Sequence, residues 1–478
     1  MTTNLRLELF TAEEVGNMYG KCLHLLSTKG VKIAHQEALK ILANAGAQVN
    51  FDDERVKFSK DIIEEALRTV PHSVKLAGRS EENDFTLPEP GGLFYTHTAS
   101  GCPNYAEPDN YHPTTLADVA EWAQLASVLD EITITSFLSA QDVPEATADI
   151  HGLRTVLENT SKHIIVQPYS AEAIKYLLEL SLAVAGSKEA LKKRPVISSF
   201  ACTLPPFVFD TVHTEVVLQA SRLGVPIYAN PLANAGATSP ITIPGMILQS
   251  STEILGQLVM SQLFQAGTPV IARPVSLALD MSTGRILLSS IESSLGGAAV
   301  VQFVKEAFHI PAYTHGFGTD SYIVDGQAML DKLLMGLLVD LAGGDILTGA
   351  GQIDVAIAAS PVQLIIDNEL AKILKRVRSG IKIDDDTLAW KEILGIEPGG
   401  HYLELTHTLR HCREALRSEL PVTQPRDNWI AGGSRDLHAR MVEEYKELKK
   451  KLQPQPLSEE VKKELNRIVK QADEHLVK

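Results

Sequence analysis

The chain has 478 residues, of which 44% are hydrophobic and 22% are charged, an ordinary composition for a folded globular protein. Its formal net charge of -15 argues against nucleic acid or an anionic membrane as a partner, because both are negatively charged. Four cysteines, Cys22, Cys102, Cys202 and Cys412, lie far apart without metal-ligand spacing. We therefore expect neither disulfides nor a metal site.

The first eight residues are polar where a signal peptide needs an apolar core. No run of roughly 18 apolar residues occurs, so no membrane span is expected. Both observations predict a cytoplasmic protein.

Residues 1–90 carry mainly helical signals. Thr11 and Glu14 have the spacing of a capping box, and apolar residues spaced by three and four recur at 23–27, 38–43 and 62–70. A Pro- and Gly-rich stretch at 87–92 ends this part. We predict a helical N-terminal extension over residues 1–90.

Eight short apolar or β-branched runs follow, and a helical pattern succeeds each of them. The runs are Leu93–His97, Ile132–Phe137, His163–Gln167, Val196–Ala201, Pro226–Asn230, Val270–Arg273, Pro311–His315 and Asp345–Gly349. The helical patterns are Thr115–Leu129, Asp149–Glu158, Ala171–Ala185, Val208–Leu223, Met246–Ala266, Ser289–Phe308, Asp325–Leu341 and Pro361–Val377.

Strand and helix alternating eight times predict an α/β fold, a (β/α)8 TIM barrel with helical N-terminal and C-terminal extensions. An open doubly wound sheet is the competing interpretation, but the glycine fingerprint of a dinucleotide-binding turn is missing after the first run. We place the barrel at residues 91–378 and the C-terminal extension at 379–478. Residues 435–477 are highly charged with heptad-like apolar spacing, which indicates a solvated helical tail or a dimer brace.

The active sites of such barrels lie at the C-terminal ends of the strands. Here these ends, and the loops that follow them, carry aromatic and polar side chains but few carboxylates. Because aromatic residues make up only 6% of the chain, their recurrence favours a quaternary ammonium ligand held by cation–π contacts. The candidate substrate-binding residues are Tyr95, His97, Tyr169, Phe200, Tyr228, Asn230, Arg273, His315, Phe317, Tyr322 and Gln352.

Several of these candidates have an equally simple structural interpretation. Arg273 could clamp a substrate carboxylate, or it could form an ion pair at the barrel mouth with Asp280 or Asp320. His315 and Asp320 could position the substrate or a water molecule, but His315 could also be an ordinary strand-end histidine. Tyr and Phe side chains at strand ends are common in barrel cores. Gly349-Ala-Gly351 lacks the basic neighbours of a phosphate site.

Segments along nearly the whole chain resemble the trimethylamine methyltransferase family. They are Thr114–Ala126, Gly318–Gln327, Leu347–Gly351, His407–His411 and Arg426–Gly433. Founding members of that family carry pyrrolysine, whereas this chain is written with the twenty standard residues. It therefore resembles the non-pyrrolysine branch, which includes a glycine betaine:corrinoid protein methyltransferase. Tyr322 departs from the family pattern, which commonly has a basic residue in this loop.

The resemblance implies a reaction with a separate partner protein. One methyl group would move from a quaternary amine, with glycine betaine (giving dimethylglycine) as the leading substrate, to the Co(I) of a cognate corrinoid protein. Cob(I)alamin and methylcob(III)alamin would be presented by that partner, so no tightly bound cofactor is expected. Because Co(I) is the nucleophile and the amine leaves uncharged, the barrel would mainly position the substrate. The resemblance leaves homo-oligomerisation open.

Other functions stay open at this point. Carnitine, proline betaine or another quaternary amine could replace glycine betaine as the substrate. A lyase or aldolase would need a Schiff-base lysine at a strand end, and no run ends in lysine. A non-catalytic barrel that binds quaternary amines is the remaining alternative.

Overall fold

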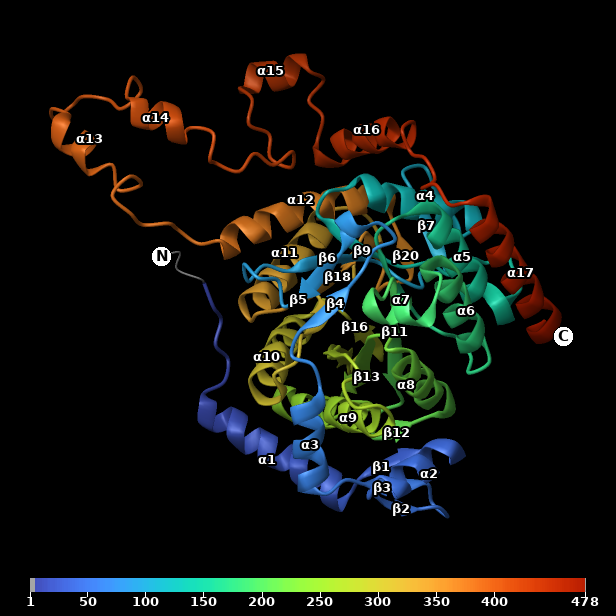
Figure 1. Cartoon of the computed structure of the whole chain (residues 1–478). Coiled ribbons are helices and arrows are strands. Elements are labelled where there is room, and N and C mark those ends of the chain that lie inside the picture. Colours follow the sequence, from blue (N-terminus) through green and yellow to red (C-terminus); the bar gives the residue numbers. More distant parts are fainter. Residues whose placement is uncertain (1–4, 478) are drawn as a thin grey trace.

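The computed structural model describes residues 5–477 and has a barrel of eight parallel strands at its centre, as the sequence predicts (Figure 1). The strands are β6 (Tyr95–Thr98), β9 (Ile132–Thr135), β10 (His163–Val166), β11 (Ile197–Thr203), β13 (Ile227–Ala235), β14 (Val270–Ala272), β17 (Tyr313–His315) and β18 (Ile346–Ala350). Each strand is followed by one of the outer helices, namely α4 (Leu116–Val128), α5 (Ala148–Asn159), α6 (Ala173–Ala185), α8 (Thr211–Leu223), α9 (Ile243–Phe264), α10 (Ile291–Phe308), α11 (Gly326–Leu341) and α12 (Pro361–Arg378). A short helix, α7 (Lys188–Lys193), lies between α6 and β11.

The strands pair in chain order around a closed ring. Parallel ladders join β6 through β9, β10, β11 and β13 to β14, and others join β17 to β18 and β18 to β6. A parallel bridge between Ala272 and Ala312 closes the gap between β14 and β17, where the Ala272 amide donates to the Pro311 carbonyl oxygen at 2.8 Å. The strand ends of the sixth and seventh runs are therefore neighbours.

Local signals fix where several outer helices begin and end. The capping box at Thr115 and Asp118 starts α4, with the Thr115 backbone amide donating to the Asp118 carboxylate at 2.7 Å. Gly186 and Gly224 end α6 and α8 with φ values of 84° and 68°, a left-handed conformation that glycine adopts without strain. These caps were visible in the sequence, which explains why the helix positions could be predicted.

The N-terminal part contains the expected helices and also strands that the sequence analysis did not predict. The helices are α1 (Ala12–Thr28), α2 (Gln36–Asn44) and α3 (Lys60–Thr69), and all three contact α9. The strands β1 (Val31–Ile33), β2 (Gln48–Asn50) and β3 (Arg55–Lys57) form a small sheet with β12 (Val208–Phe209). The description of residues 1–90 as mainly helical is thus incomplete, because three-residue strands give almost no periodic signal.

A hairpin closes the N-terminal end of the barrel. It consists of β4 (Val74–Leu76) and β5 (Phe85–Leu87), and its side chains Val74, Leu76 and Leu87 share one buried cluster with barrel-interior residues such as Ile134 and Ile165. The opposite, C-terminal end carries one further small sheet and a hairpin. The small sheet joins β7 (Asn104–Glu107) and β8 (Asn110–Pro113) to β19 (Gln352–Ile353) and β20 (Ala358–Ala359). The hairpin of β15 (Val275–Asp280) and β16 (Arg285–Leu287) extends the barrel sheet, because β15 pairs in parallel with the end of β13.

After α12 the chain forms an arm that extends away from the barrel and then returns (Figure 1). The arm, residues 379–436, carries α13 (Trp390–Gly395), α14 (Thr406–His411) and α15 (Arg426–Ala431). The returning helices α16 (Leu437–Lys449) and α17 (Glu459–Leu476) pack on α12 and on α5 and α6, and bury Met441, Tyr445, Leu465 and Ile468. The expectation of a solvated tail is therefore wrong for these two helices. Within residues 5–477, no helix combines the length and apolarity needed to cross a lipid bilayer.

Candidate active site

Three consecutive strand ends are joined by side-chain hydrogen bonds inside the barrel mouth. Arg273 directly follows β14 and donates through Nη1 to Asn230 Oδ1 at 2.6 Å. Asn230, on β13, donates in turn to Cys202 Sγ on β11 at 2.9 Å. The Arg273 Cζ atom lies 4.4 Å from the ring centre of Phe200 and 5.1 Å from that of Tyr313, both within cation–π range. The mouth is thus built around one guanidinium group.

Arg273 is a buried cation without a counter-ion. Its side chain is 8% exposed, it forms no ion pair with any described residue, and its Nε atom has no hydrogen-bond partner among residues 5–477. The alternative that the sequence left open, an ion pair of Arg273 with Asp280 or Asp320, does not form, because both carboxylates are engaged elsewhere. Asp280 accepts hydrogen bonds from Ser282 and Thr283 within its own turn. A buried charge without an opposite charge is costly, so this site favours an anionic ligand.

Asp320 anchors a loop instead of facing the barrel interior. Its carboxylate accepts hydrogen bonds from the backbone amides of Leu288 and Ser289, at 2.9 and 3.0 Å, and from Ser289 Oγ at 2.8 Å. It therefore ties the loop after β17 to the segment between β16 and α10. Its position is explained by this structural role, which the sequence did not reveal.

His315 is the last residue of β17 and lies half-buried at the mouth. Burial, together with the charges of Arg273 and Lys332, lowers its pKa to about 3, so the imidazole is neutral near pH 7. The structure records no hydrogen bond between this ring and another described residue. The ring nitrogens are therefore available to a substrate group or a water molecule.

His97 is fully occupied by protein partners. Its Nδ1 atom lies 2.9 Å from the Tyr313 hydroxyl and 2.7 Å from Thr348 Oγ1, and its Nε2 atom lies 2.8 Å from Ser136 Oγ. Burial, assisted by the nearby Arg273 charge, lowers its pKa well below the ordinary value. His97 therefore supports the Tyr313 ring on which Arg273 rests, and it has no free nitrogen for a ligand.

Phe200 and Tyr228 belong to the barrel core together with Tyr313. Their three ring centres are separated by 5.0 to 5.9 Å, and all three side chains are almost fully buried. The sequence suggested these aromatic faces as a cage for a substrate cation. In the structure the rings of Phe200 and Tyr313 instead hold the guanidinium of Arg273.

The other candidates are dispersed. Tyr95 lies at the opposite, N-terminal end of the barrel, with its ring 4.4 Å from that of Phe85 in the closing hairpin. Phe317 is fully buried against Phe94, outside the barrel interior. Tyr95 and Phe317 therefore do not join the Arg273 cluster. Both residues were predicted to line the site because they are close to a strand end in the sequence, but their side chains point to other parts of the molecule.

Three further candidates lie at the C-terminal face. Tyr322 is 59% exposed, and the guanidinium of Arg285 lies 4.9 Å from its ring centre. Tyr169 is partly exposed after β10, with its ring edge-on to Phe137. Gln352 is buried, and its Nε2 atom has no partner among the described residues. These positions surround the mouth without touching Arg273 through any recorded hydrogen bond.

A buried ion pair that the sequence analysis missed holds the loops around His315. Lys332 on α11 lies 2.8 Å from Asp367 on α12, and both side chains are fully buried. Lys332 also donates to the Phe317 carbonyl oxygen at 2.7 Å, while the Gly351 amide donates to Asp367 at 2.7 Å. The pair thus fixes the loops that follow β17 and β18. The sequence feature that could have revealed this pair is a lysine and an aspartate, each placed among the apolar residues of a predicted helix.

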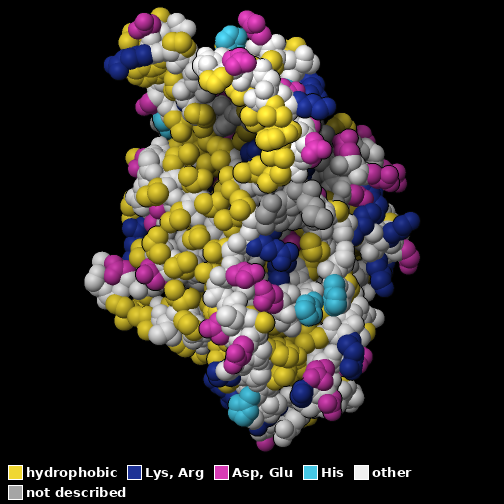
Figure 2. Space-filling view, turned by 90° about the vertical axis from the view of Figure 1, so that its left-hand side faces the viewer, with side chains coloured by type: hydrophobic (Ala, Val, Ile, Leu, Met, Phe, Trp, Pro, Cys, Tyr) yellow, Lys and Arg dark blue, Asp and Glu magenta, His cyan; other side chains and the backbone are white. Residues whose placement is uncertain are grey.

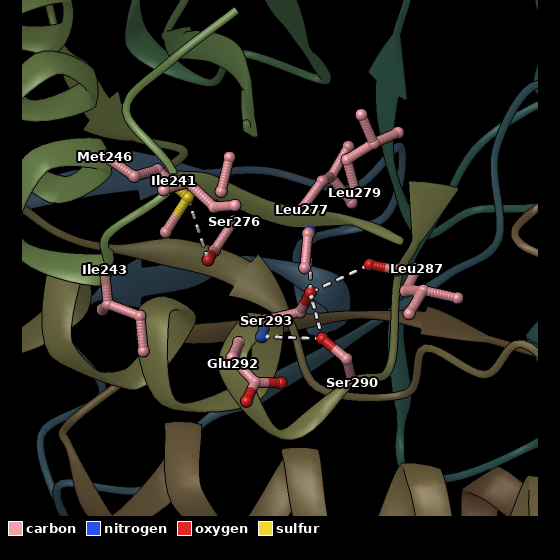
Figure 3. A pocket seen from close by; sticks show the side chains of 12 residues that line it. Ile241, Ile243, Met246, Ser276, Leu277, Leu279, Leu287, Ser290, Glu292 and Ser293 are labelled. Carbon is pink, nitrogen blue, oxygen red and sulfur yellow. Dashed lines mark hydrogen bonds between the residues drawn. The ribbon is translucent and has the colours of Figure 1, made fainter. Parts of the chain in front are cut away.

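A separate apolar cavity of about 210 Å³ lies beside the mouth (Figure 3). It is formed by β15, β16 and the first turns of α9 and α10, and Glu292 is the charged residue in its lining. Ser293 hydrogen-bonds there to the Leu287 carbonyl oxygen and caps the hairpin. None of the predicted site residues lines this cavity.

Comparison with known proteins identifies the family. The sequence profile described as trimethylamine methyltransferase (MTTB) matches residues 2–476. The trimethylamine methyltransferase MttB of Desulfitobacterium hafniense is 30% identical over 468 residues, which cover 97% of this chain and 94% of that protein. A glycine betaine methyltransferase of the same species is 25% identical over 434 residues, covering 89% and 88% of the two chains.

A solved structure supports the fold. The monomethylamine methyltransferase MtmB of Methanosarcina barkeri superposes with a TM-score of 0.53 over 93% of both chains, at 12% sequence identity. At that identity the likeness shows the fold alone. The family profile, which spans almost the whole sequence, shows more: this chain is a methyltransferase and belongs to the trimethylamine methyltransferase family.

Proposed function

We propose that this protein transfers a methyl group from a quaternary amine that carries a carboxylate, with glycine betaine as the leading substrate, to the Co(I) of a separate corrinoid protein. The observation that supports this substrate class is the unpaired, buried charge of Arg273. Trimethylamine has no carboxylate to neutralise it, whereas glycine betaine, carnitine and proline betaine each have one. The similar proteins include enzymes named for both kinds of substrate.

In this proposal Arg273 binds the substrate carboxylate, and Asn230 fixes the orientation of the guanidinium through its 2.6 Å hydrogen bond. The arrangement directs the quaternary nitrogen toward the mouth, where His315 is neutral and does not repel a cation. The partner's corrinoid supplies the nucleophile at that opening. Because the amine leaves without a proton, the residues of this chain contribute orientation and exclusion of water and need not act as acid or base.

The neutral state of His97 and His315 also fits the change in charge during the reaction. The positive charge of the substrate disappears as its N–C bond breaks. A ring of carboxylates would stabilise the substrate more than the transition state and would slow the reaction. The Arg273 cluster contains no carboxylate among the described residues, which is compatible with a site that does not hold the ammonium group tightly.

The test is a methyl-transfer assay with purified corrinoid protein reduced to Co(I), followed by the absorbance change that accompanies its methylation. Glycine betaine, carnitine and proline betaine are compared with choline and trimethylamine, which lack the carboxylate. We expect at least about tenfold faster transfer from one of the carboxylated amines than from choline, corresponding to about 1.4 kcal/mol. Equal rates with choline would refute the carboxylate contact, and no transfer from any amine would refute the proposed reaction.

A further inference from the structure

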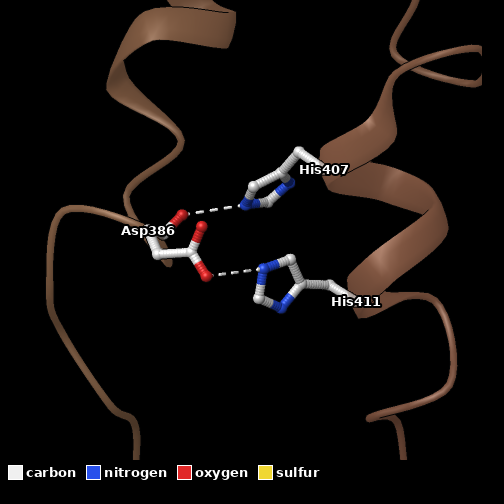
Figure 4. A group of neighbouring side chains, drawn as sticks. All are labelled: Asp386, His407 and His411. Atoms are coloured by element: carbon white, nitrogen blue, oxygen red, sulfur yellow. Dashed lines mark hydrogen bonds and ion pairs between the residues drawn. The ribbon is translucent and has the colours of Figure 1, made fainter.

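We propose that the arm binds one Zn²⁺-like divalent ion through Asp386, His407 and His411 (Figure 4). One potential ligand atom from each of these three side chains lies within 4.8 Å of the others. His407 and His411 are four residues apart on α14, so their rings lie on one face of the helix, with centres 4.3 Å apart. The site lies on the arm and shares no residue with the Arg273 cluster.

The histidine rings converge on Asp386. His407 Nε2 lies 2.8 Å from the Asp386 carbonyl oxygen, and His411 Nε2 lies 3.2 Å from Asp386 Oδ2 (Figure 4). A metal ion at about 2.0–2.2 Å from two imidazole nitrogens and one carboxylate oxygen draws these ligand atoms closer together. It also replaces the hydrogen bond between His407 and the Asp386 carbonyl oxygen. Two nitrogens and one oxygen suit Zn²⁺ and leave a fourth position for water or a partner's group.

A second carboxylate holds His411 in the orientation that metal ligation requires. His411 Nδ1 lies 2.8 Å from Glu414 Oε1, on the far side of the ring from Asp386. When Nδ1 carries the proton for Glu414, the Nε2 lone pair points at the Asp386 carboxylate, and two electron-rich groups face each other. Either a second proton on the ring or a metal ion between the two groups relieves this conflict. Such carboxylate–histidine–metal arrangements are common around bound metals.

One neighbour competes with the metal for Asp386. Arg410 Nη2 lies 3.0 Å from Asp386 Oδ1, whereas His411 faces Oδ2. The two oxygens can therefore serve the two cations separately, although the positive charge of Arg410 weakens metal binding. Removing that charge should strengthen the binding.

The arm also offers a physical reason for a metal. Each of its helices α13, α14 and α15 has six residues and buries none of them. Helices of this length are not stable in water by themselves. A metal bound by Asp386 and α14 would link the turn before α13 to the helix that follows it, and would hold this part of the arm together.

The exposed side chains of the arm show why a metal link would matter there. Leu403 and Leu409 are 81% and 75% exposed, and Trp390, Leu394 and Ile430 are also exposed. Figure 2 shows apolar side chains gathered in a broad band over this side of the molecule. A metal bound by Asp386 and α14 would therefore stabilise a segment whose helices bury no side chain.

The metal proposal is tested on the full-length protein after treatment with a chelator. Calorimetric titration with Zn²⁺ should show one site per chain, and Co²⁺ should give the visible absorption of a tetrahedral site. His407→Ala and His411→Ala should each weaken binding at least tenfold, Arg410→Ala should tighten it, and the control His401→Ala should leave it unchanged.

Unchanged Zn²⁺ affinity in the double variant His407→Ala/His411→Ala would overturn the proposal, as would a loss of affinity in Arg410→Ala. Digestion by a protease provides a readout that does not depend on calorimetry. Zn²⁺ should slow cleavage within residues 379–436 of the wild-type chain and should have no such effect on the double variant.

Discussion

Replacing Arg273 by methionine separates the energetic cost of its buried charge from its use in binding. Methionine keeps an unbranched apolar side chain against the rings of Phe200 and Tyr313, but it removes the guanidinium and its hydrogen bond to Asn230. Because no described carboxylate pairs with Arg273, the substitution leaves no opposite charge unpaired. The expected result is a protein that folds normally and no longer binds the carboxylate of its substrate.

The magnitudes follow from the contacts. The substitution gives up cation–π contacts worth about 0.5–2 kcal/mol each and one charged hydrogen bond worth about 1.5–3 kcal/mol. It recovers the desolvation cost of a buried ion, which is several kcal/mol. These terms nearly cancel, so we expect the free energy of unfolding to change by less than about 2 kcal/mol. Losing the contact to a substrate carboxylate should instead lower kcat/KM for glycine betaine by about tenfold to a hundredfold.

Urea unfolding and initial rates of methyl transfer provide the two measurements. Arg194→Met is the matched control, because Arg194 donates to both Asp84 oxygens at 2.8 and 2.9 Å, and its loss leaves Lys75, at 3.0 Å, as the remaining ion-pair partner of that carboxylate among the described residues. The control should lose stability and keep its kcat/KM. If Arg273→Met is destabilised as much as Arg194→Met, or if its rates with betaine and choline fall equally, Arg273 is a structural residue and the reasoning fails.

Three further substitutions test other parts of the site. His315→Ala should lower betaine turnover by about tenfold or more, and an unchanged rate in this variant would place His315 outside the site. Because its pKa of about 3 keeps His315 neutral, the pH profile of the wild-type rate should show no ionisation of this group between about pH 5 and pH 8. Lys332→Met should cost about 3–5 kcal/mol of unfolding free energy in urea, because Asp367 is left buried and unpaired, and the double variant Lys332→Met/Asp367→Leu should recover at least half of that loss. Burial raises the pKa of Asp340 to about 7, so the native state binds this proton more tightly than the unfolded chain does. The free energy of unfolding should therefore fall as pH rises from about 4 to about 7. Asp340→Asn should reduce that fall, and an unchanged pH dependence of the unfolding free energy would contradict the raised pKa of Asp340.

The fold could be predicted because its signals are local. Each barrel strand and outer helix has its own apolar pattern, and caps such as Thr115 and Gly186 mark where helices begin and end. The arm also showed as a shift in composition after Arg378. The packing of α16 and α17 on the barrel could not be predicted, because an apolar stripe does not say which surface covers it.

The candidate site was predicted less well, because a residue belongs to it only if its side chain lies at the right position along the barrel axis. Tyr95 and His97 both belong to β6, yet the ring of Tyr95 lies against the closing hairpin while His97 reaches Thr348. A shift of two residues along a strand moves a side chain by about 7 Å, which decides whether it can touch a ligand. The missing partner of Arg273 was equally invisible, because it depends on where Asp280 and Asp320 direct their carboxylates.

The hairpin of β4 and β5 has a consequence for the order of events in turnover. It seals the N-terminal end of the barrel, so a ligand held by Arg273 reaches solvent through the C-terminal mouth. Under the proposed function the corrinoid protein must cover that same opening. The amine then has to enter before the two proteins meet, and the demethylated product has to wait until they part. Turnover at saturating amine would therefore be limited by how fast the two proteins separate, and a tighter complex would make a slower enzyme.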